Sequence, residues 1–209
     1  MARVTQAHLD ARRRQILDGA ALCFARNGFH ATSMQDVLKE VNLSAGAVYR
    51  YFSGKDELIA AIVGEVLGVL GSTYEGAAAE TPPPLPDVLL PRALRQLREA
   101  RPVLLASGEW LFSRLLVQVW TEVLRNPELA EVLRAGYERV RGAWAMVVEG
   151  YKSAGLIPAD ADADALARVM IALAQGYTVH LAVFEELPPE TLEKGLRALM
   201  SMRAPQPSE

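Results

Sequence analysis

The sequence has few of the residues that build disulfide frameworks and metal centres. It contains one cysteine, Cys23, which excludes an intramolecular disulfide and cannot hold a zinc ion by itself. We expect Cys23 to be a small buried core residue of a protein in a reducing compartment. The three histidines, His8, His30 and His180, are far apart in the sequence. The sequence therefore indicates neither a metal site nor a bound cofactor.

Long uncharged apolar runs are also missing. The N-terminal stretch MARVTQAHLDARRRQ has no apolar segment of the kind found in secretion signals. No later run reaches the thickness of a bilayer without a charge or a proline. We therefore expect a cytoplasmic protein without a membrane partner.

The common sequence motifs of enzymes are absent as well. The chain lacks a glycine-rich phosphate loop, a nucleophile elbow and the HExxH pattern of zinc proteases. We expect no catalytic residues, and a helical enzyme is kept as an alternative from another class.

Charge is divided unevenly along the chain. The net charge of the whole protein is −3, yet residues 1–60 hold eight basic and six acidic residues, a net of +2. The rest of the chain carries a net of −5. An acidic body with a mildly basic head suggests a polyanionic partner for the head alone.

Nearly every segment between breakers is typical of helix. Alternating β-branched residues are absent, and Ala, Leu, Glu and Arg dominate these segments. Asn27-Gly28 ends the first helix, and the proline-rich stretch at 76–86 is the clearest later break. The sequence predicts an all-α fold with helices near 9–27, 55–71, 87–100, 103–125, 127–153, 161–185 and 188–202, besides two short ones between 32 and 52.

These two short helices have the spacing of a helix-turn-helix. Thr32 and Ser33 are candidate N-caps of the first, since Gln35 and Asp36 follow them by three residues. Asn42 lies in the turn, where a residue with positive φ is needed and asparagine is the best substitute for glycine. The next cap residue, Ser44, opens the second helix.

The second helix of such a motif enters the major groove by its N-terminal end. Small residues there allow a close approach, and the exposed backbone amides favour phosphate. The tyrosines, Arg50 and Lys55 can donate hydrogen bonds to phosphate or to base edges. The predicted DNA-binding residues are Thr32, Ser33, Gln35, Ser44, Ala45, Gly46, Tyr49, Arg50, Tyr51 and Lys55.

This stretch resembles the DNA-binding head of the TetR-type (TetR/AcrR-like) transcription regulators. The resemblance covers residues 9–71, and its pattern in GFHATSMQDVLKEVNLSAGAVYRYFSGKDEL matches at Thr32, Leu43, Ser44, Gly46, Tyr49, Phe52, Lys55 and Leu58. Two positions depart from it: Asn42 stands where the family often has glycine, and Tyr51 where it often has histidine. The body resembles the family only in being helical and of the usual length.

The resemblance implies a body, residues 55–203, that binds a small molecule and dimerises through its last two helices. Aromatic and polar side chains of the kind that line ligand cavities give the predicted effector pocket, although core packing explains each of them as well. These residues are Trp110, Phe112, Trp120, Tyr137, Trp144, Tyr177 and His180. Small and apolar residues on the last two helices give the predicted dimer interface: Ala165, Val169, Ala172, Gly176, Leu192, Leu196 and Leu199.

Together these features predict a homodimeric repressor that binds a palindromic operator in double-stranded DNA. An unknown small-molecule effector would release it. The head is expected at 1–54, with 1–8 disordered, and a flexible tail at 204–209. An effector-independent architectural or cell-division factor of the same fold is a further alternative.

Overall fold

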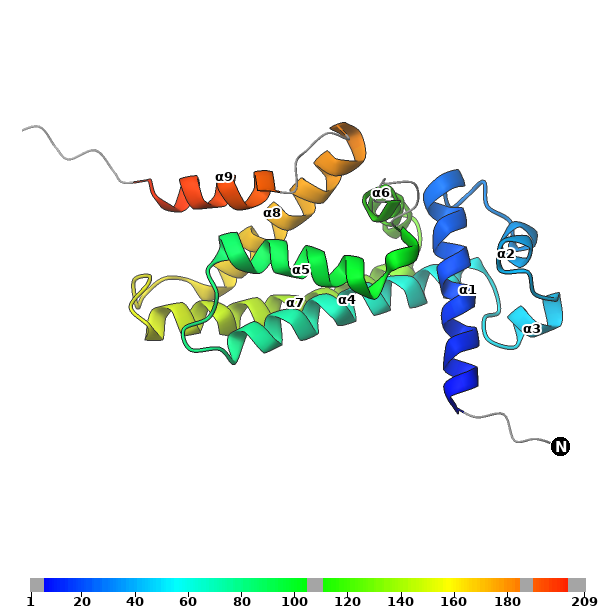
Figure 1. Cartoon of the computed structure of the whole chain (residues 1–209), viewed down its shortest axis with the longest axis horizontal. Coiled ribbons are helices and arrows are strands. Elements are labelled where there is room, and N and C mark those ends of the chain that lie inside the picture. The colour runs from blue at the N-terminus through cyan, green and yellow to red at the C-terminus, as the bar shows by residue number, and fades with distance from the viewer. Residues whose placement is uncertain (1–5, 105–110, 185–189, 203–209) are drawn as a thin grey trace, which may run out of the picture.

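The N-terminal head consists of three helices that pack across one end of a longer helical body (Figure 1). The computed structural model describes residues 6–104, 111–184 and 190–202. In the head, α1 spans Gln6–Asn27, α2 spans Met34–Val41 and α3 spans Ala45–Tyr49. No strand occurs among the described residues, so the predicted all-α class is confirmed.

The head has its own apolar core. Ile16, Leu17 and Phe24 of α1 are fully buried, and they meet Val37 of α2 and Val48 of α3 in the same core. Cys23 is buried beside them, and this burial raises the pKa of its thiol to about 11, as expected for a structural cysteine.

Glycine allows two sharp features of the head. Gly28 adopts φ +86°, the left-handed conformation that ends α1. Gly19 lies where α1 packs against α2. A Cβ at this position would collide with Cγ1 of Val41. The two helices therefore approach more closely than an alanine would allow.

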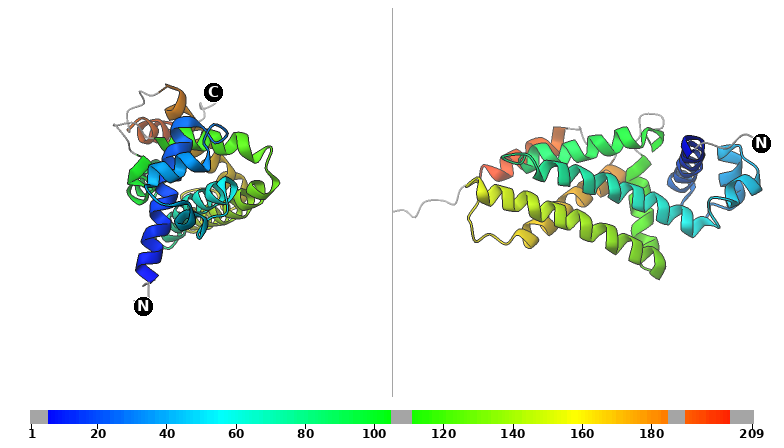
Figure 2. Two further views of the ribbon diagram at one scale, coloured as in Figure 1. Left: turned by 90° about the vertical axis from the view of Figure 1, so that its right-hand side faces the viewer. Right: turned by 90° about the horizontal axis from the view of Figure 1, so that it is seen from below.

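The described part of the body contains six α-helices and a short 3₁₀-helix. Figures 1 and 2 show α4 and α7 running side by side along its length, with the head at one end. The elements are α4 (Lys55–Ala78), α5 (Pro86–Ala100), η1 (Pro102–Leu104), α6 (Leu111–Val123), α7 (Pro127–Ser153), α8 (Ala163–Phe184) and α9 (Glu190–Met200).

Two of these boundaries test the sequence predictions closely. α7 has the predicted bounds, with Pro127 in the first turn and the Asn126 side chain accepting a hydrogen bond from the Leu129 amide at 3.0 Å. In contrast, α4 continues to Ala78, about two turns past the predicted end at Gly71. The extension is stabilised by packing, since Thr73, Tyr74 and Ala77 are buried.

By length and composition alone, helices α4 and α8 could each cross a bilayer. Core helices of globular proteins pass the same test, and half of the apolar window of α4 is buried within the fold, against 17% of that of α8. The finding is therefore weak evidence for a membrane span, and it marks α8 as a helix with an uncovered apolar face.

Candidate DNA-binding head and effector cavity

The first helix of the helix-turn-helix begins with a complete capping box. Ser33 is the N-cap of α2: its hydroxyl accepts a hydrogen bond from the Asp36 amide at 3.2 Å, and the Asp36 carboxylate accepts one from the Ser33 amide at 2.8 Å. The Ser33 hydroxyl also donates to this carboxylate at 2.6 Å, and the bonds that the Asp36 carboxylate accepts from the Ser33 hydroxyl and amide hold its pKa below the usual value. Of the two candidate caps, Ser33 is therefore the one used.

The turn has the predicted geometry. Asn42 adopts φ 50° and ψ 50°, a left-handed conformation, and its amide bonds the last carbonyls of α2. The Ser44 hydroxyl then accepts a hydrogen bond from the Ala47 amide at 3.3 Å and caps α3. The departure from glycine at position 42 thus leaves the backbone of the motif intact.

The start of α3 forms an open surface. Ser44, Ala45 and Gly46 are exposed, and a Cβ added to Gly46 would meet nothing within 4 Å. One turn on, Tyr49 is 49% exposed and Arg50 is exposed as well. This surface presents backbone amides and small side chains first and longer donors behind them, which is the order that a helix entering a major groove needs.

Ser33 and Gln35 extend this surface to the start of α2, where both are exposed. The α2 and α3 N-termini therefore both carry exposed residues of the predicted DNA-binding set. Tyr51 is half-buried and packs against the core, so it is less accessible than Tyr49.

Two predicted contact residues also make hydrogen bonds inside the head. Thr32 is 1% exposed, and its hydroxyl bonds the carbonyl of Gly28 at 2.8 Å, so it is placed to fix the loop rather than to reach DNA. The Lys55 ammonium donates to the carbonyl of Phe29 at 2.9 Å and lies 4.8 Å from the centre of the Phe29 ring. Sequence reasoning placed both at the surface because local spacing does not reveal these bonds across the loop.

The body contains a cavity of about 100 Å³ between α4, α5, α6, α7 and α8. All but two of its lining residues are aliphatic or aromatic, the exceptions being Gln175 and Thr178 on α8. The Tyr137 hydroxyl donates to Oε1 of Gln175 at 3.4 Å, a long hydrogen bond. Deep in the body, burial raises the pKa of Tyr74, another lining residue, to about 12. The cavity is therefore apolar with a few uncharged polar groups, as ligand sites commonly are.

The structure divides the predicted pocket residues. Phe112, Trp120 and Tyr137 line the cavity. Trp144 does not line it but is fully buried behind Tyr74, with ring centres 4.9 Å apart. Tyr177 and His180 do not line the cavity either; the first is half-buried and the second exposed. Trp110 falls outside the described residues.

Aliphatic residues of α4 and α5, such as Val66 and Leu97, complete the cavity wall and were not predicted. Nothing in their spacing separates a cavity wall from ordinary core. Gln175 carried a usable signal, since it is a lone amide in an apolar helix.

Comparison with known proteins assigns the fold to a family. Residues 16–62 match the model of bacterial regulatory proteins of the tetR family, and residues 105–203 match that of the C-terminal part of BetI-type transcriptional repressors. The chain belongs to the TetR family. It is a DNA-binding transcriptional regulator, as the sequence resemblance implies.

Individual relatives of this TetR-family chain agree with the assignment. The transcriptional repressor Rv1474c of Mycobacterium tuberculosis is 42% identical over 65 residues, 31% of this chain and 35% of that protein, so this likeness spans about a third of either. The regulator UidR of Escherichia coli K12 is 24% identical over 93% of this chain and 94% of its own.

Solved structures show the same fold. Salmonella enterica GusR has a TM-score of 0.70 and 26% identity, covering 96% of this chain and all of its own. A transcriptional regulator from Saccharomonospora viridis in complex with choline has a TM-score of 0.68 and 23% identity, covering 91% of this chain and 96% of its own.

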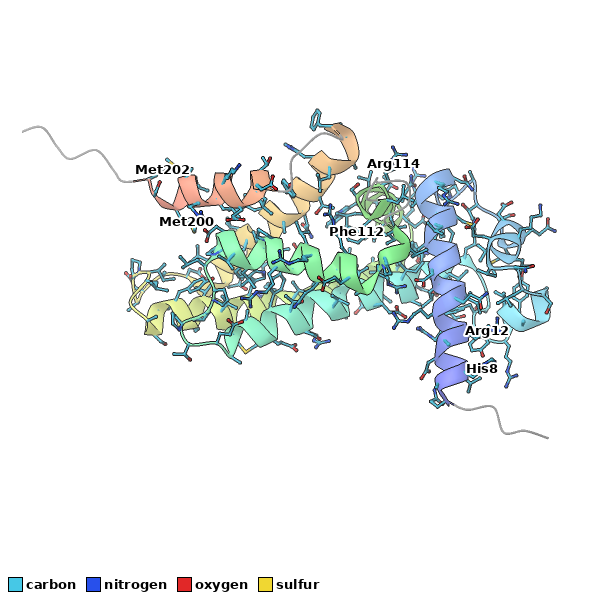
Figure 3. All side chains as sticks on the ribbon, in the orientation of Figure 1. His8, Arg12, Phe112, Arg114, Met200 and Met202 are labelled. Atoms are coloured by element: carbon cyan, nitrogen blue, oxygen red, sulfur yellow. The ribbon has the colours of Figure 1, made fainter. Side chains whose placement is uncertain are left out.

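In this TetR-family structure, α6 joins the cavity to the head. Its residues Leu115 and Val119 line the cavity. From the same helix, the Gln118 side chain lies beside Gly28, and Oε2 of the buried Glu122 is 3.1 Å from Nε2 of His30. Phe112 and Arg114 lie near the start of α6 (Figure 3); the Phe112 side chain is buried and that of Arg114 is exposed.

A buried arginine forms a second junction. Arg101, which follows α5, is 3% exposed; its guanidinium bonds Asp18 of α1 at 2.8 Å and also Glu65 of α4. Glu65 in turn bonds Arg13 of α1 at 2.6 Å, and Arg13 lies over the ring of Phe52. Sequence reasoning missed this cluster, because its members are far apart in the sequence, as Arg101 and Asp18 are by 83 positions.

The predicted dimer residues also fall into two groups. Ala165, Val169, Ala172 and Gly176 are exposed along one stripe of α8. On α9, Leu192 and Leu196 are buried in the core of this chain, where α9 packs on α5, so they are not available to a second copy. Leu199 is 54% exposed, near Met200 and Met202 at the C-terminal end of α9 (Figure 3).

Among the described residues, no group of three or more His, Cys, Asp or Glu side chains is placed to hold a metal ion.

Proposed function

We propose that this regulator is a homodimeric repressor that leaves a palindromic operator when a small molecule occupies the body cavity. The observation that carries the proposal is the position of α6. One side of this helix lines the cavity, and the other touches the head at Gly28 and His30. A ligand that moves α6 therefore acts directly on the DNA-binding motif.

The head of the proposed regulator comprises residues 1–54 and the body residues 55–203. Ser33, Gln35, Ser44, Ala45, Gly46, Tyr49 and Arg50 are its proposed DNA contacts, all at the exposed ends of α2 and α3. The N-terminal amides of these helices would bind phosphate, and Arg50 would bind phosphate or a guanine edge.

Two helices would carry the ligand signal. α4 begins in the head at Lys55, which bonds the Phe29 carbonyl, and lines the cavity with Ile62 and Val63. α6 lines the same cavity and contacts α1. An effector that separates α4 from α6 would change the spacing of the two heads in a dimer. A difference of 1–3 kcal/mol in its affinity for the two states is enough for regulation.

The proposed dimer forms through the exposed stripe of α8. Val169 is 51% exposed and Val183 61%, and the small residues Ala172 and Gly176 lie between them. Small residues allow close helix approach, and an uncovered apolar face of this kind favours a two-fold contact with a second copy. Such a dimer would present two recognition helices to half-sites about one helical turn apart.

The tests are operator selection and mass measurement. Selection from random double-stranded DNA should return a two-fold symmetric sequence, and sedimentation should give twice the mass of one chain. Val169→Glu should produce monomers, whereas Leu124→Glu, at an 85% exposed apolar residue away from the stripe, should leave the dimer intact. Selection of asymmetric or random sequences, or a monomeric wild type, would contradict the proposal.

A repressor of this kind works in the cytoplasm, where its DNA is, and performs no catalysis. Its function is an equilibrium between DNA-bound and released states that the effector shifts.

A further inference from the structure

The wall of the body cavity carries no charged side chain among the residues described. Aliphatic groups from α4 to α8 form most of it, and Phe112 and Trp120 add aromatic faces. Burial raises the pKa of the lining residue Tyr137, and the charge of Arg168 lowers it to a smaller extent. Arg168 is itself exposed, lies outside the lining and is paired with Asp164 at 2.8 Å.

Three polar atoms of the lining already have hydrogen-bond partners. The Thr178 hydroxyl donates to the Ala174 carbonyl of its own helix at 2.8 Å. The Tyr137 hydroxyl donates to Oε1 of Gln175. Gln175 is half-buried and lines the cavity, and its only side-chain hydrogen bond among the described residues is the one that Oε1 accepts, so the N–H groups of its amide are the donors that a ligand in the cavity can use.

An ion transferred into such a site would lose its hydration without gaining a counter-ion, and the resulting penalty would oppose binding strongly. A neutral group that accepts one hydrogen bond would instead pair with Gln175. From this we infer that the effector is a neutral, largely apolar small molecule with a single hydrogen-bonding group, held at the Gln175 and Tyr137 end of the cavity. The inference rests on the proposed function, since it names the ligand class of the same cavity.

The size of the cavity adds a consequence. About 100 Å³ is less than the roughly 150 Å³ of an apolar cavity that binds benzene, so the cavity as it stands has room only for a small group such as a short alkyl chain. A larger neutral molecule must separate the helices that line the cavity, among them α4 and α6. Binding of a larger neutral ligand would therefore also cause the helix movement that releases DNA.

A matched ligand series tests the charge requirement on the full-length protein. The members share a pentylphenyl body and differ in the head group: para-pentylphenol, para-pentylbenzoate and para-pentyl-N,N,N-trimethylanilinium. Calorimetric titration at pH 8 should give a Kd for the phenol at least tenfold lower than for either charged compound. A benzoate or an anilinium that binds as tightly as the phenol would overturn the inference.

A variant that changes charge with little change in shape sharpens the test. Gln175→Glu should raise the Kd of the phenol at least fivefold and bring the anilinium to tighter binding than in the wild type. Gln96→Glu is the matched control, because Gln96 is exposed on α5 outside the cavity. Gln175→Leu, which should weaken the phenol without favouring the anilinium, provides the same evidence if the glutamate variant unfolds in a circular dichroism melt.

The outcomes separate the ligand class from the proposed function. Tighter binding of a charged compound, with release of operator DNA by that compound, rejects the neutral class and keeps the effector-controlled repressor. Binding of the phenol without release of DNA keeps the ligand class and rejects effector control. Failure of all three compounds to bind rejects the neutral class, while operator selection still tests DNA binding by itself.

Discussion

Nη1 of Arg101 lies 2.8 Å from Oδ1 of Asp18, which links the end of α5 in the body to α1 in the head. The Arg101 side chain is 4% exposed, so this ion pair is desolvated on the arginine side. The same guanidinium bonds Glu65 of α4. One side chain thus fixes two carboxylates on two helices, and the orientation of the head depends on it.

We expect Arg101→Met to destabilise the protein by about 2 kcal/mol, since a hydrogen-bonded charged group is removed from a buried site. Urea unfolding followed by circular dichroism measures this. Arg134→Met is the matched control: the Arg134–Glu131 pair is exposed on α7, and its loss should change the free energy of unfolding by less than about 0.5 kcal/mol. Equal effects of the two substitutions would show that the buried cluster is not a structural link.

Two glycines of the head should respond oppositely to alanine. A Cβ at Gly19 would collide with Val41, so we expect Gly19→Ala to destabilise the head by about 1–3 kcal/mol. A Cβ at Gly46 meets nothing, so we expect Gly46→Ala to be neutral or to stabilise by about 0.5 kcal/mol. Thermal unfolding of both variants checks the pair.

A larger substitution at Gly46 tests whether the start of α3 enters the major groove of DNA. Gly46→Leu should leave the melting temperature unchanged and weaken operator binding at least tenfold, because its side chain would occupy the space that DNA needs. Fluorescence anisotropy with labelled operator measures the binding. Unchanged affinity would remove the start of α3 from the interface.

Substitutions of Tyr49 and Lys55 should differ in their effect on the stability of the protein. Tyr49 is half-exposed, and the structure gives its hydroxyl no role in the fold, so Tyr49→Ala should weaken binding to specific and non-specific DNA with little change in stability. Lys55→Ala removes the bond to the Phe29 carbonyl and should lower the melting temperature as well. A salt-controlled gel shift beside a melt distinguishes the two effects. Equal loss of stability in both would contradict this division.

The capping box of α2 predicts a pH dependence. Ser33 holds the pKa of Asp36 below its usual 3.8, so the contribution of this carboxylate to stability is complete above that pH and is lost as pH falls through the lowered value. Ser33→Ala should therefore lower the melting temperature most near neutral pH, with a difference that shrinks below about pH 4. A difference that stays constant into acid would exclude the charged form of Asp36 as its origin.

Local chemistry made the head predictable from sequence. Ser33 and Asp36 are three positions apart, and Asn42 supplies its own left-handed turn, so neighbouring residues contain the information. The buried roles of Thr32 and Lys55 depend on the loop between α1 and α2 folding back, which local spacing does not specify.

The body was less predictable because its sites are long-range. Tertiary packing brings Arg101 into contact with Asp18 and Glu65, and no sequence pattern within a single helix predicts this contact. Likewise, Leu192 and Leu196 have the spacing of an interface, but packing of α9 on α5 buries them inside one chain. Periodicity identifies an apolar face without saying what covers it.

Reciprocal coupling between the cavity and the head is the most direct test of the account. The Kd of the selected operator is measured by fluorescence anisotropy with and without saturating para-pentylphenol, and the Kd of para-pentylphenol by calorimetry with and without operator. We expect each ligand to weaken the other by the same factor, at least fivefold, because binding linkage is reciprocal. Affinities that are independent of each other would show that the cavity does not control the DNA-binding head.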